Sequence, residues 1–404
     1  IISDKDSVTN LWLDRGTSGW RLDVADEVSD ETWRAFRDAV KEAGQDNVVI
    51  GEIWTDASKY LLGDMYDSVM NYRFRGSVLG YASGSKTADL TMNELEKMRE
   101  QYPKEAFQAM MNLVGSHDKP RVLSSLDGVD DSDQSRHVGA ASEKARSKMN
   151  LIPFFQMTYP GTPTIYYGDE LGMVGAADPD NRRGMIWGKG DKELVERYAT
   201  LAAVRNAYST LRTGDINTIS TENDAVIAYE RFDKNNEVLV LMNNSSKAQK
   251  VTIDLKNIDA KKLYNALDKD SYYDIADGKI TVKVPAMDGL ILVKKFKKLN
   301  LNLDGLKDGY DEKYVVAERI AYVEPTNPTD PSKPTKSDEQ TESGNTGNNS
   351  TSAGNNDNKK STNKKNSPSI LSKTGGIGIT VIVGMSIIVV AIGVVLFRKK
   401  KKIS

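Results

Sequence analysis

The stretch Gly-Trp-Arg-Leu-Asp-Val-Ala-Asp-Glu-Val, residues 19–28, determines the fold class that the sequence predicts. Apolar and polar side chains alternate along its first part, which is the period of a β-strand. A helical pattern follows over residues 30–43, so the strand delivers a carboxylate to its C-terminal end. Arg21 and Asp23 would be costly inside a buried strand unless they pair with each other or face a cavity. The stretch therefore holds either a structural ion pair or a functional acid.

A second strand repeats this arrangement over residues 47–54, Asn-Val-Val-Ile-Gly-Glu-Ile-Trp. Strand, helix and strand within about 35 residues form a βαβ unit, in which the two strands are parallel. Asp23 and Glu52 are therefore expected at the same end of the sheet. Gly51 removes a side chain directly before Glu52, which would let a ligand or another backbone segment approach closely.

A third acid ends another apolar segment, Asn-Leu-Val-Gly-Ser-His-Asp at residues 112–118. In this order, the motifs around Asp23, Glu52 and Asp118 resemble three signature regions of the α-amylase family, glycoside hydrolase family 13. Three more segments resemble the branch that holds neopullulanases, cyclomaltodextrinases and maltogenic amylases; they are residues 69–74, 160–173 and 178–187. The similarity runs from about residue 13 to residue 187 and continues more weakly to about residue 295.

The resemblance implies roles for the three acids in the hydrolysis of a glycosidic bond. This reaction needs one carboxylate at the anomeric carbon and one carboxylic acid that protonates the leaving oxygen. By resemblance, Asp23 is the nucleophile, Glu52 is the general acid/base, and Asp118 holds sugar hydroxyls. The expected activity is a retaining double displacement on α-1,4 bonds of starch, pullulan or maltodextrin, with α-1,6 bonds as a further option and no redox or organic cofactor.

Three further residues are expected to bind substrate or to support the acids. Arg21 stands two residues before Asp23 on the same strand face, so it should keep Asp23 ionised by charge pairing. His117 is expected to hydrogen-bond a sugar hydroxyl, with a structural loop histidine as the alternative. Trp54 offers a ring for an apolar sugar face, with core packing as the alternative.

Other chemistry-bearing residues have a simpler interpretation. Asp169 and Glu170 are either further acids at the rim of the site or, as the sequence favours, charges at the start of a helix that its macrodipole stabilises. For Tyr72, Tyr166 and Tyr167, core packing and sugar stacking are equally compatible with the pattern. Many family members bind calcium, but the sequence contains no clustered oxygen-ligand loop of the Asp-x-Asp-x-Asp-Gly kind.

Composition narrows the classes of function. The chain has 404 residues, 39% of them hydrophobic, and a formal net charge of −2, which is no electrostatic signature for nucleic acid. It contains no cysteine and two histidines, so disulfides, thiolate catalysis and Cys-based zinc sites are excluded. A neutral polysaccharide or oligosaccharide fits this balance better than a charged polymer.

Residues 1–213 are expected to form the C-terminal part of a TIM (β/α)8 barrel. Only five of its strands can be assigned, at residues 19–25, 48–54, 67–71, 109–115 and 164–167. Helical patterns include residues 92–101 and residues 142–157, the latter kinked at Pro153. The first three barrel strands of the family are not found before residue 19, so we expect an N-terminally truncated chain that is inactive and folds poorly by itself.

The periodicity changes after residue 214, where a small antiparallel β-sandwich domain is expected to extend to residue 297. Its predicted strands are residues 225–232, 237–243, 249–255, 262–266, 279–284 and 289–293. Support of the barrel by packing is favoured over carbohydrate binding for this domain. Residues 298–324 stay unassigned.

The C-terminal residues predict the location. Residues 325–370 are rich in Thr, Asn, Ser and Lys, so they form a disordered linker. Residues 375–397 are uncharged and apolar, long enough for a transmembrane helix, and a basic tail follows, which places that end in the cytoplasm. Leu-Ser-Lys-Thr-Gly at residues 371–375 resembles the Leu-Pro-x-Thr-Gly sortase signal, with Ser372 in place of proline.

Two kinds of location and three kinds of function follow. The protein is expected on the surface of a Gram-positive bacterium, attached through sortase to peptidoglycan or held by a single-pass membrane anchor. The leading function is an α-glucan hydrolase. A transglycosylase differs only in whether sugar or water releases the product from Asp23. A non-catalytic surface glucan-binding protein or an inactive fragment is the remaining alternative, and the presence of all three acids favours the enzyme.

Overall fold

The computed structural model describes residues 1–255, 258–299 and 301 of the chain. The predicted linker at residues 325–370, and the sortase-like signal, apolar span and basic tail at residues 371–404, lie outside the described residues. Among the helices of the described part, none combines the length and the apolar character that crossing a bilayer requires.

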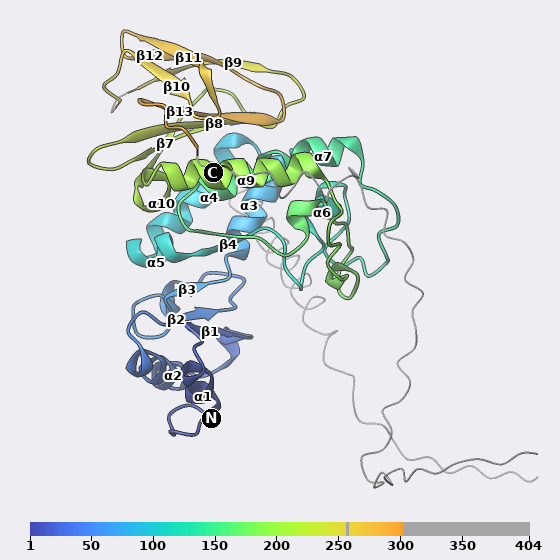
Figure 1. The fold of residues 1–404 in the computed structure, drawn as a ribbon, viewed down its shortest axis with the longest axis vertical. Coiled ribbons are helices and arrows are strands. Elements are labelled where there is room, and N and C mark those ends of the chain that lie inside the picture. Colours follow the sequence, from blue (N-terminus) through green and yellow to red (C-terminus); the bar gives the residue numbers. More distant parts are fainter. Residues whose placement is uncertain (256–257, 300, 302–404) are drawn as a thin grey trace, which may run out of the picture. The chain divides into compact units, whose positions relative to one another are not determined.

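Residues 1–213 contain five short parallel strands among helices (Figure 1). They are β1 (Gly19–Leu22), β2 (Val48–Gly51), β3 (Ser68–Val69), β4 (Met111–Leu113) and β5 (Thr162–Thr164). Each pairs with its neighbour in sequence, and a single bridge between Met70 and Met111 joins β3 to β4. Parallel strands in sequential order, joined by segments that contain helical turns, are consistent with part of a TIM barrel.

Gly19 is required where β1 begins. Its φ is +149°, and a Cβ at this position would lie 2.2 Å from the Val48 carbonyl oxygen. Only glycine therefore allows β1 and β2 to pair in the observed register, Gly19 with Val48 and Leu22 with Gly51.

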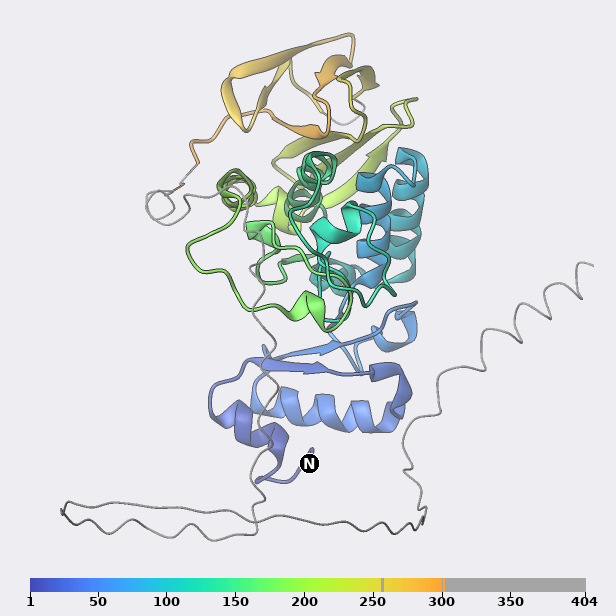
Figure 2. The ribbon, with the colours of Figure 1, turned by 90° about the vertical axis from the view of Figure 1, so that its right-hand side faces the viewer.

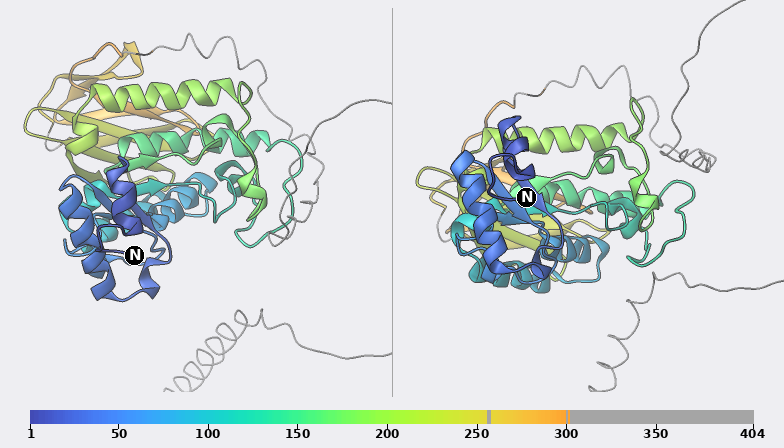
Figure 3. Two further views of the ribbon diagram at one scale, coloured as in Figure 1. Left: turned by 60° about the horizontal axis from the view of Figure 1, so that its bottom comes forward. Right: turned by 90° about the horizontal axis from the view of Figure 1, so that it is seen from below.

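Helices cover this sheet and fill the connections. The α-helices are α1 (Val8–Asp14), α2 (Asp30–Ala43), α3 (Tyr72–Ser83), α4 (Ala88–Gln101), α5 (Lys104–Ala109), α6 (Val122–Leu126), α7 (Glu143–Met149), α8 (Leu151–Thr158), α9 (Lys192–Ala207) and α10 (Thr210–Thr213). The 3-10 turns are η1 (Ala25–Glu27), η2 (Ser58–Tyr60), η3 (Asp169–Leu171) and η4 (Asp180–Arg182). α2 lies along the β1–β3 sheet (Figure 2), and the long helix α9 packs beside α8 (Figure 3).

The predicted helix at residues 30–43 is confirmed as α2 with the same bounds. Its first turn is capped because the Ser29 hydroxyl accepts a hydrogen bond from the Thr32 N–H. Trp33, Phe36 and Val40 are buried on its inner side. The apolar spacing and the cap thus act together, which is why the sequence alone could define both ends.

Several boundary predictions were wrong: β2, β3 and β4 are shorter than predicted, and α4 begins at Ala88 instead of residue 92. The helix predicted at residues 142–157 is two helices, α7 and α8, because the chain breaks at Asn150 and Pro153 falls in the first turn of α8, where no backbone donor is lost. The last strand, β5, begins two residues and ends three residues earlier than the predicted strand at residues 164–167. β1 ends at Leu22 because Val24 adopts a left-handed conformation, with φ 43°.

Residues 215–293 form an antiparallel sheet of eight strands in the order β6-β7-β8-β13-β10-β11-β12-β9. Their bounds are β6 (Asp215–Ile219), β7 (Val226–Phe232), β8 (Glu237–Asn243), β9 (Gln249–Asp254), β10 (Lys262–Asn265), β11 (Asp268–Ala276), β12 (Lys279–Val284) and β13 (Asp288–Val293). β12 contacts β8 and β13, which are not its neighbours in the sheet, so the sheet folds over a core of its own. The six predicted strands are confirmed to within one residue at each end, whereas β6 and β11 were not predicted.

The strands β7, β8 and β13 are buried on both faces. Side chains alternate between the faces of a strand, and one set joins the core of the barrel part: Ile227, Tyr229, Val238, Val240, Met242, Ile291 and Val293. The alternate set lines the core inside the folded sheet: Val226, Ala228, Leu239, Leu241, Leu290 and Leu292. These strands therefore belong to two hydrophobic cores at once.

A buried arginine fastens the same region. Arg231 is fully buried on β7 and donates hydrogen bonds to the carbonyl oxygens of Thr158 (2.6 Å), Leu211 (2.9 Å), Gly214 (2.8 Å) and Asp215 (3.2 Å). Burial lowers the pKa of this guanidinium to about 10, so it stays charged at neutral pH. One side chain thus supplies hydrogen-bond donors to backbone carbonyl groups at the end of α8, in and after α10, and at the start of β6.

Replacing Arg231 with methionine, which keeps much of the apolar stem, should lower the free energy of unfolding by about 3 kcal/mol or more, because buried carbonyl groups lose their donors. Unfolding followed by circular dichroism in denaturant measures this loss. Lys104→Met is the control, since the Lys104–Asp215 pair is 60% and 49% exposed and should contribute no more than about 1 kcal/mol. Equal midpoints for the two variants would contradict the structural role of Arg231.

Candidate active site

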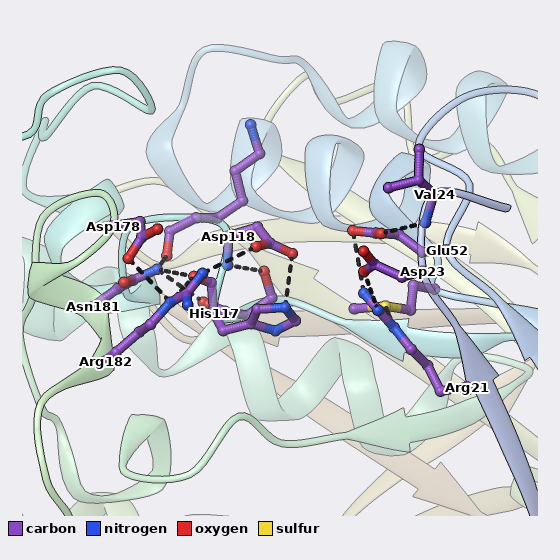
Figure 4. A network of polar contacts seen from close by, with 12 residues as sticks. Arg21, Asp23, Val24, Glu52, His117, Asp118, Asp178, Asn181 and Arg182 are labelled. Carbon is purple, nitrogen blue, oxygen red and sulfur yellow. Dashed lines mark hydrogen bonds and ion pairs between the residues drawn. The ribbon is translucent and has the colours of Figure 1, made fainter. Parts of the chain in front are cut away.

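The six predicted site residues lie at or near the C-terminal ends of β1, β2 and β4. Arg21 lies within β1 and Asp23 directly follows it, whereas Glu52 is the first residue after β2. Asp118 lies in the loop between β4 and α6, residues 114–121. Because all these strands are parallel, their carboxyl ends meet at one edge, where the functional sites of barrel enzymes are built. Figure 4 shows two groups of side chains at this edge, one around Arg21 and one around Asp118.

Arg21 holds two carboxylates at once. Its Nη1 lies 2.5 Å from Asp23 Oδ1 and its Nη2 lies 3.2 Å from Glu52 Oε1. The Arg21 guanidinium holds the pKa of Asp23 below its ordinary value, chiefly by this hydrogen bond. The Asp23 side chain is 72% exposed. The structure therefore places an ionised carboxylate, open to a ligand, beside a second acid.

Glu52 has the opposite environment. Its side chain is only 8% exposed. Oε2 accepts a hydrogen bond from the Val24 N–H at 3.1 Å, and Oε1 accepts one from Trp54 Nε1 at 3.0 Å. The left-handed conformation of Val24 turns that N–H toward Glu52 and is unfavourable for a β-branched residue. The local fold thus fixes one buried and one exposed carboxylate beside the same guanidinium.

Two aromatic rings link Glu52, which follows β2, to the loop after β4. The Trp54 and Tyr72 ring centroids are 4.7 Å apart, and Lys119 Nζ lies 4.5 Å from the Trp54 centroid. The Tyr72 hydroxyl lies 3.0 Å from Ser116 Oγ and 3.4 Å from Asp118 Oδ2. Burial raises the pKa of Tyr72 to about 12, so the phenol stays neutral and can donate to the carboxylate.

Asp118 is contacted at both oxygens. His117 Nε2 lies 3.1 Å from Oδ2, and Arg182 Nη2 lies 3.5 Å from Oδ1. The Asp118 N–H also donates to Ser116 Oγ at 3.1 Å. Sequence reasoning singled out His117 and Asp118 but missed Ser116 and Arg182. The signal for Arg182 was the motif at residues 178–187, which had been used only for its resemblance.

Two sequence interpretations need correction. A Cβ on Gly51 would lie 3.3 Å from Ala25 and from Tyr66, so the missing side chain makes room for the core and not for a ligand. Asp169 is the first residue of η3, but its carboxylate is buried instead of solvated. A Cβ on Gly115 would lie 1.9 Å from Asp169 Oδ2. This acid therefore packs directly against the backbone of the loop that leads to the site.

No group of three or more His, Asp and Glu side chains gathers as a metal-binding cluster within the part of the chain that the structure describes. At the edge of the sheet, the carboxylates instead pair with guanidinium, imidazole and hydroxyl groups. Two carboxylates in different environments, with hydrogen-bonding groups and an exposed ring nearby, can carry out acid-assisted substitution at a sugar carbon.

Comparison with protein families gives two matches. Residues 3–197 match the family described as alpha amylase, catalytic domain. Residues 216–291 match the family described as maltogenic amylase, C-terminal domain. The first match contains all six predicted site residues, and the second covers the antiparallel sheet.

Individual proteins agree with the family matches. Amylopullulanase of Thermoanaerobacterium saccharolyticum is 34% identical over 322 residues, which cover 72% of this chain and 25% of that protein. Neopullulanase 2 of Thermoactinomyces vulgaris is 37% identical over 289 residues, 70% of this chain and 46% of that protein. A solved cyclomaltodextrinase structure has a TM-score of 0.62 at 34% identity, over 71% of this chain and 47% of that one. The chain thus spans less than half the length of each of these relatives.

The buried acid beneath the site generates a prediction on stability. Desolvation raises the pKa of Asp169 to about 7, although Arg121, 3.6 Å away, opposes the shift. The folded protein therefore binds a proton that the unfolded chain releases above its ordinary pKa of 3.8. This contribution to stability is complete below pH 4 and is lost as the pH rises to about 7, at about 1.4 kcal/mol per pKa unit.

Asp169→Asn should remove this contribution, so its free energy of unfolding relative to wild type should rise steadily between pH 4.5 and pH 7.5. Denaturant titrations across this range measure the difference. Asp64→Asn is the control for the substitution itself, because Asp64 belongs to an ion pair whose two side chains are each 45% exposed, and its free energy of unfolding should differ from wild type by no more than about 1 kcal/mol. A flat difference for Asp169→Asn would show that Arg121 keeps Asp169 ionised throughout.

Proposed function

Because the chain belongs to the α-amylase family of glycoside hydrolases and carries a maltogenic-amylase C-terminal domain, we propose that the complete protein hydrolyses α-glucosidic bonds with retention of configuration. The observation that carries the proposal is the placement of two acids on one guanidinium. Arg21 contacts an exposed Asp23 and a buried Glu52. Two neighbouring carboxylates of this kind suit a double displacement, in which one acts as nucleophile and the other as acid and then base.

The two steps use the acids in turn. Asp23 attacks the anomeric carbon while Glu52 gives its proton to the glycosidic oxygen, so the bond to the leaving sugar breaks and a glycosyl ester of Asp23 forms. Water then attacks the same carbon, Glu52 takes a proton from it, and the Asp23 carboxylate is released. Arg21 supports the first step because it keeps Asp23 ionised.

The loop after β4 supplies the contacts to the sugar. Asp118 accepts hydrogen bonds from ring hydroxyls, and His117, which lies 41% exposed beside it, adds another polar contact. Trp54 is 43% exposed and offers its ring to the apolar face of a sugar. Tyr72 supports both by packing against Trp54 and bonding Asp118.

The substrate class follows the branch that the chain resembles. We propose starch, pullulan or maltodextrin as substrate. The bonds cleaved are α-1,4 bonds, with α-1,6 bonds as a further option. Transfer to a second sugar in place of water uses the same residues. Longer oligosaccharides among the products at high maltodextrin concentration would identify transfer.

A comparison of two variants on two substrates tests the assignment of roles. Asp23→Asn should lose about 10⁴-fold or more in kcat on maltodextrin and on an activated aryl glycoside, because both need the nucleophile. Glu52→Gln should lose nearly as much on maltodextrin but far less in the glycosylation step of the aryl glycoside, whose leaving group needs no proton. Pre-steady-state release of the aryl alcohol measures that step.

Asp38→Asn, on the exposed side of α2, is the control and should keep wild-type rates. Equal losses of Glu52→Gln on the two substrates would refute the acid assignment. A complete wild-type protein that binds maltodextrin but cuts neither substrate would refute the enzyme and favour a glucan-binding protein.

We also propose that the protein acts on the bacterial surface, a proposal that rests on the sequence of residues 371–404. If Leu-Ser-Lys-Thr-Gly is a working sortase signal, cleavage after Thr374 joins the protein to peptidoglycan and removes the apolar span. Muramidase should then release it from cells, whereas detergent should not. Release by detergent, with the C-terminal peptide still found by mass spectrometry, would instead establish a membrane anchor.

A further inference from the structure

The loop that holds His117 and Asp118 is fastened from below by one side chain. Asn181 is fully buried in η4. Its Nδ2 lies 3.3 Å from the Ser116 carbonyl oxygen, 2.8 Å from that of His117 and 2.9 Å from that of Lys119. Three carbonyl groups of one short loop thus converge on a single amide, as Figure 4 shows for the residues around Asp118.

The Asn181 amide supplies hydrogen-bond donors to backbone carbonyl groups that have no backbone partner in a helix or sheet. Residues 114–119 follow β4 and precede α6, so neither a sheet ladder nor a helix pairs the three carbonyl groups. Buried carbonyl groups without a donor are costly. A side-chain amide has only two N–H groups, so the three oxygens must share them. Sharing requires that all three stay close to one point, which fixes the curvature of the loop.

The segment that presents Asn181 is itself held in place. The Asp180 carboxylate accepts hydrogen bonds from the Ala176 N–H (2.8 Å), the His137 N–H (2.9 Å) and Arg183 Nε (2.9 Å). A Cβ on Gly175 would lie 2.9 Å from the Asn181 Cα, so this neighbour packs tightly as well. Asn181 therefore acts from a fixed support and not from a mobile loop.

The next residue reaches the acid itself. Arg182 Nε donates to the His117 carbonyl oxygen at 3.0 Å, and Arg182 Nη2 lies 3.5 Å from Asp118 Oδ1. Arg182 also pairs with Asp178, at 3.1 Å. Two adjacent residues thus hold the loop: Asn181 binds its backbone, and Arg182 binds both its backbone and the Asp118 side chain.

We propose that Asn181 is a positioning residue for the proposed glycosidase reaction: it sets where His117 and Asp118 lie relative to Asp23 and Glu52, through the loop backbone. The proposal rests on the proposed function. Asn181 is buried and does not touch the sugar, so its effect on the rate must pass through the loop residues that do. A shift of about 1 Å in such a group can cost about 10²-fold in rate.

The structure supplies a matched control. Asn243, at the end of β8, is also fully buried, and its Nδ2 donates to the carbonyl oxygens of Lys247 (2.9 Å), Val284 (3.3 Å) and Pro285 (3.0 Å). It makes the same kind of contact within the antiparallel sheet. Asn181→Leu and Asn243→Leu therefore each remove three donated hydrogen bonds, one set beneath the site and one outside it, and Asn243→Leu also removes the bond that Oδ1 accepts from the Ser245 N–H at 2.9 Å.

The first measurement compares these two variants in stability and in steady-state kinetics on maltodextrin. Both should lose stability, and Asn243→Leu should lose at least as much as Asn181→Leu. Asn181→Leu should lose about 10²-fold in kcat/KM, whereas folded Asn243→Leu should stay within about twofold of wild type. Equal activities of the two variants would overturn the proposal, because the role of Asn181 would then be structural only.

The second measurement is a double-mutant cycle with Asp118→Ala. If Asn181 acts through Asp118 and its loop, Asn181→Leu should cost less than about threefold in kcat/KM once Asp118 is gone, because residues that act as a unit are not additive. If the loss in kcat/KM of the double variant equals the product of the two single losses, the proposal is overturned. Loss of activity in Asn243→Leu as well would also overturn it, since any lost buried amide would then have the same effect.

A third arm uses protonation. In Asn181→Asp an ionised carboxylate faces three carbonyl oxygens, whereas the protonated acid can donate one hydrogen bond. The activity of this variant relative to wild type should therefore increase as the pH falls, and a constant ratio would contradict the proposal. Absence of glycosidase activity in the wild-type protein, by contrast, would refute the proposed function and not the geometry of the loop.

Discussion

The contact of one guanidinium with two carboxylates is the interaction on which the site depends. Arg21 can meet Asp23 and Glu52 together only because β1 and β2 are parallel and in register, so that both strands end at the same edge. Gly19 makes this register sterically allowed at the other end of β1. The chemistry at the C-terminal end of the sheet is thus set in part by a missing side chain at its N-terminal end.

Much of the fold could be predicted from sequence where periodicity and local signals agree. α2 was predicted with its observed bounds because Trp33, Phe36 and Val40 recur at helical spacing, and β8 and β12 because turn residues bound clear strand patterns. β11 was missed because its side chains are largely polar and only partly buried, so no apolar alternation marks it. Its place in the sheet is determined by its neighbours β10 and β12.

For the candidate site, the acids could be predicted from the sequence but the residues that support their loop could not. Acids at strand ends could be found because the βαβ pattern fixes which ends meet, and the expected family is confirmed by the matches over residues 3–197 and 216–291. Asn181 and Arg182 could not be found in this way, because they act through contacts with backbone carbonyl groups that lie more than sixty positions earlier in the chain. No local pattern records such a contact.

The double burial of β7, β8 and β13 has a consequence for how this chain can evolve. Tyr229 of β7 packs against Phe155 and Tyr159, and its hydroxyl bonds Thr158, so the sheet and the helix α8 share one aromatic cluster. A substitution on that face changes the packing of both parts. The two parts must therefore be inherited and exchanged together, and a recombination boundary placed between them would join surfaces that had never been selected to fit.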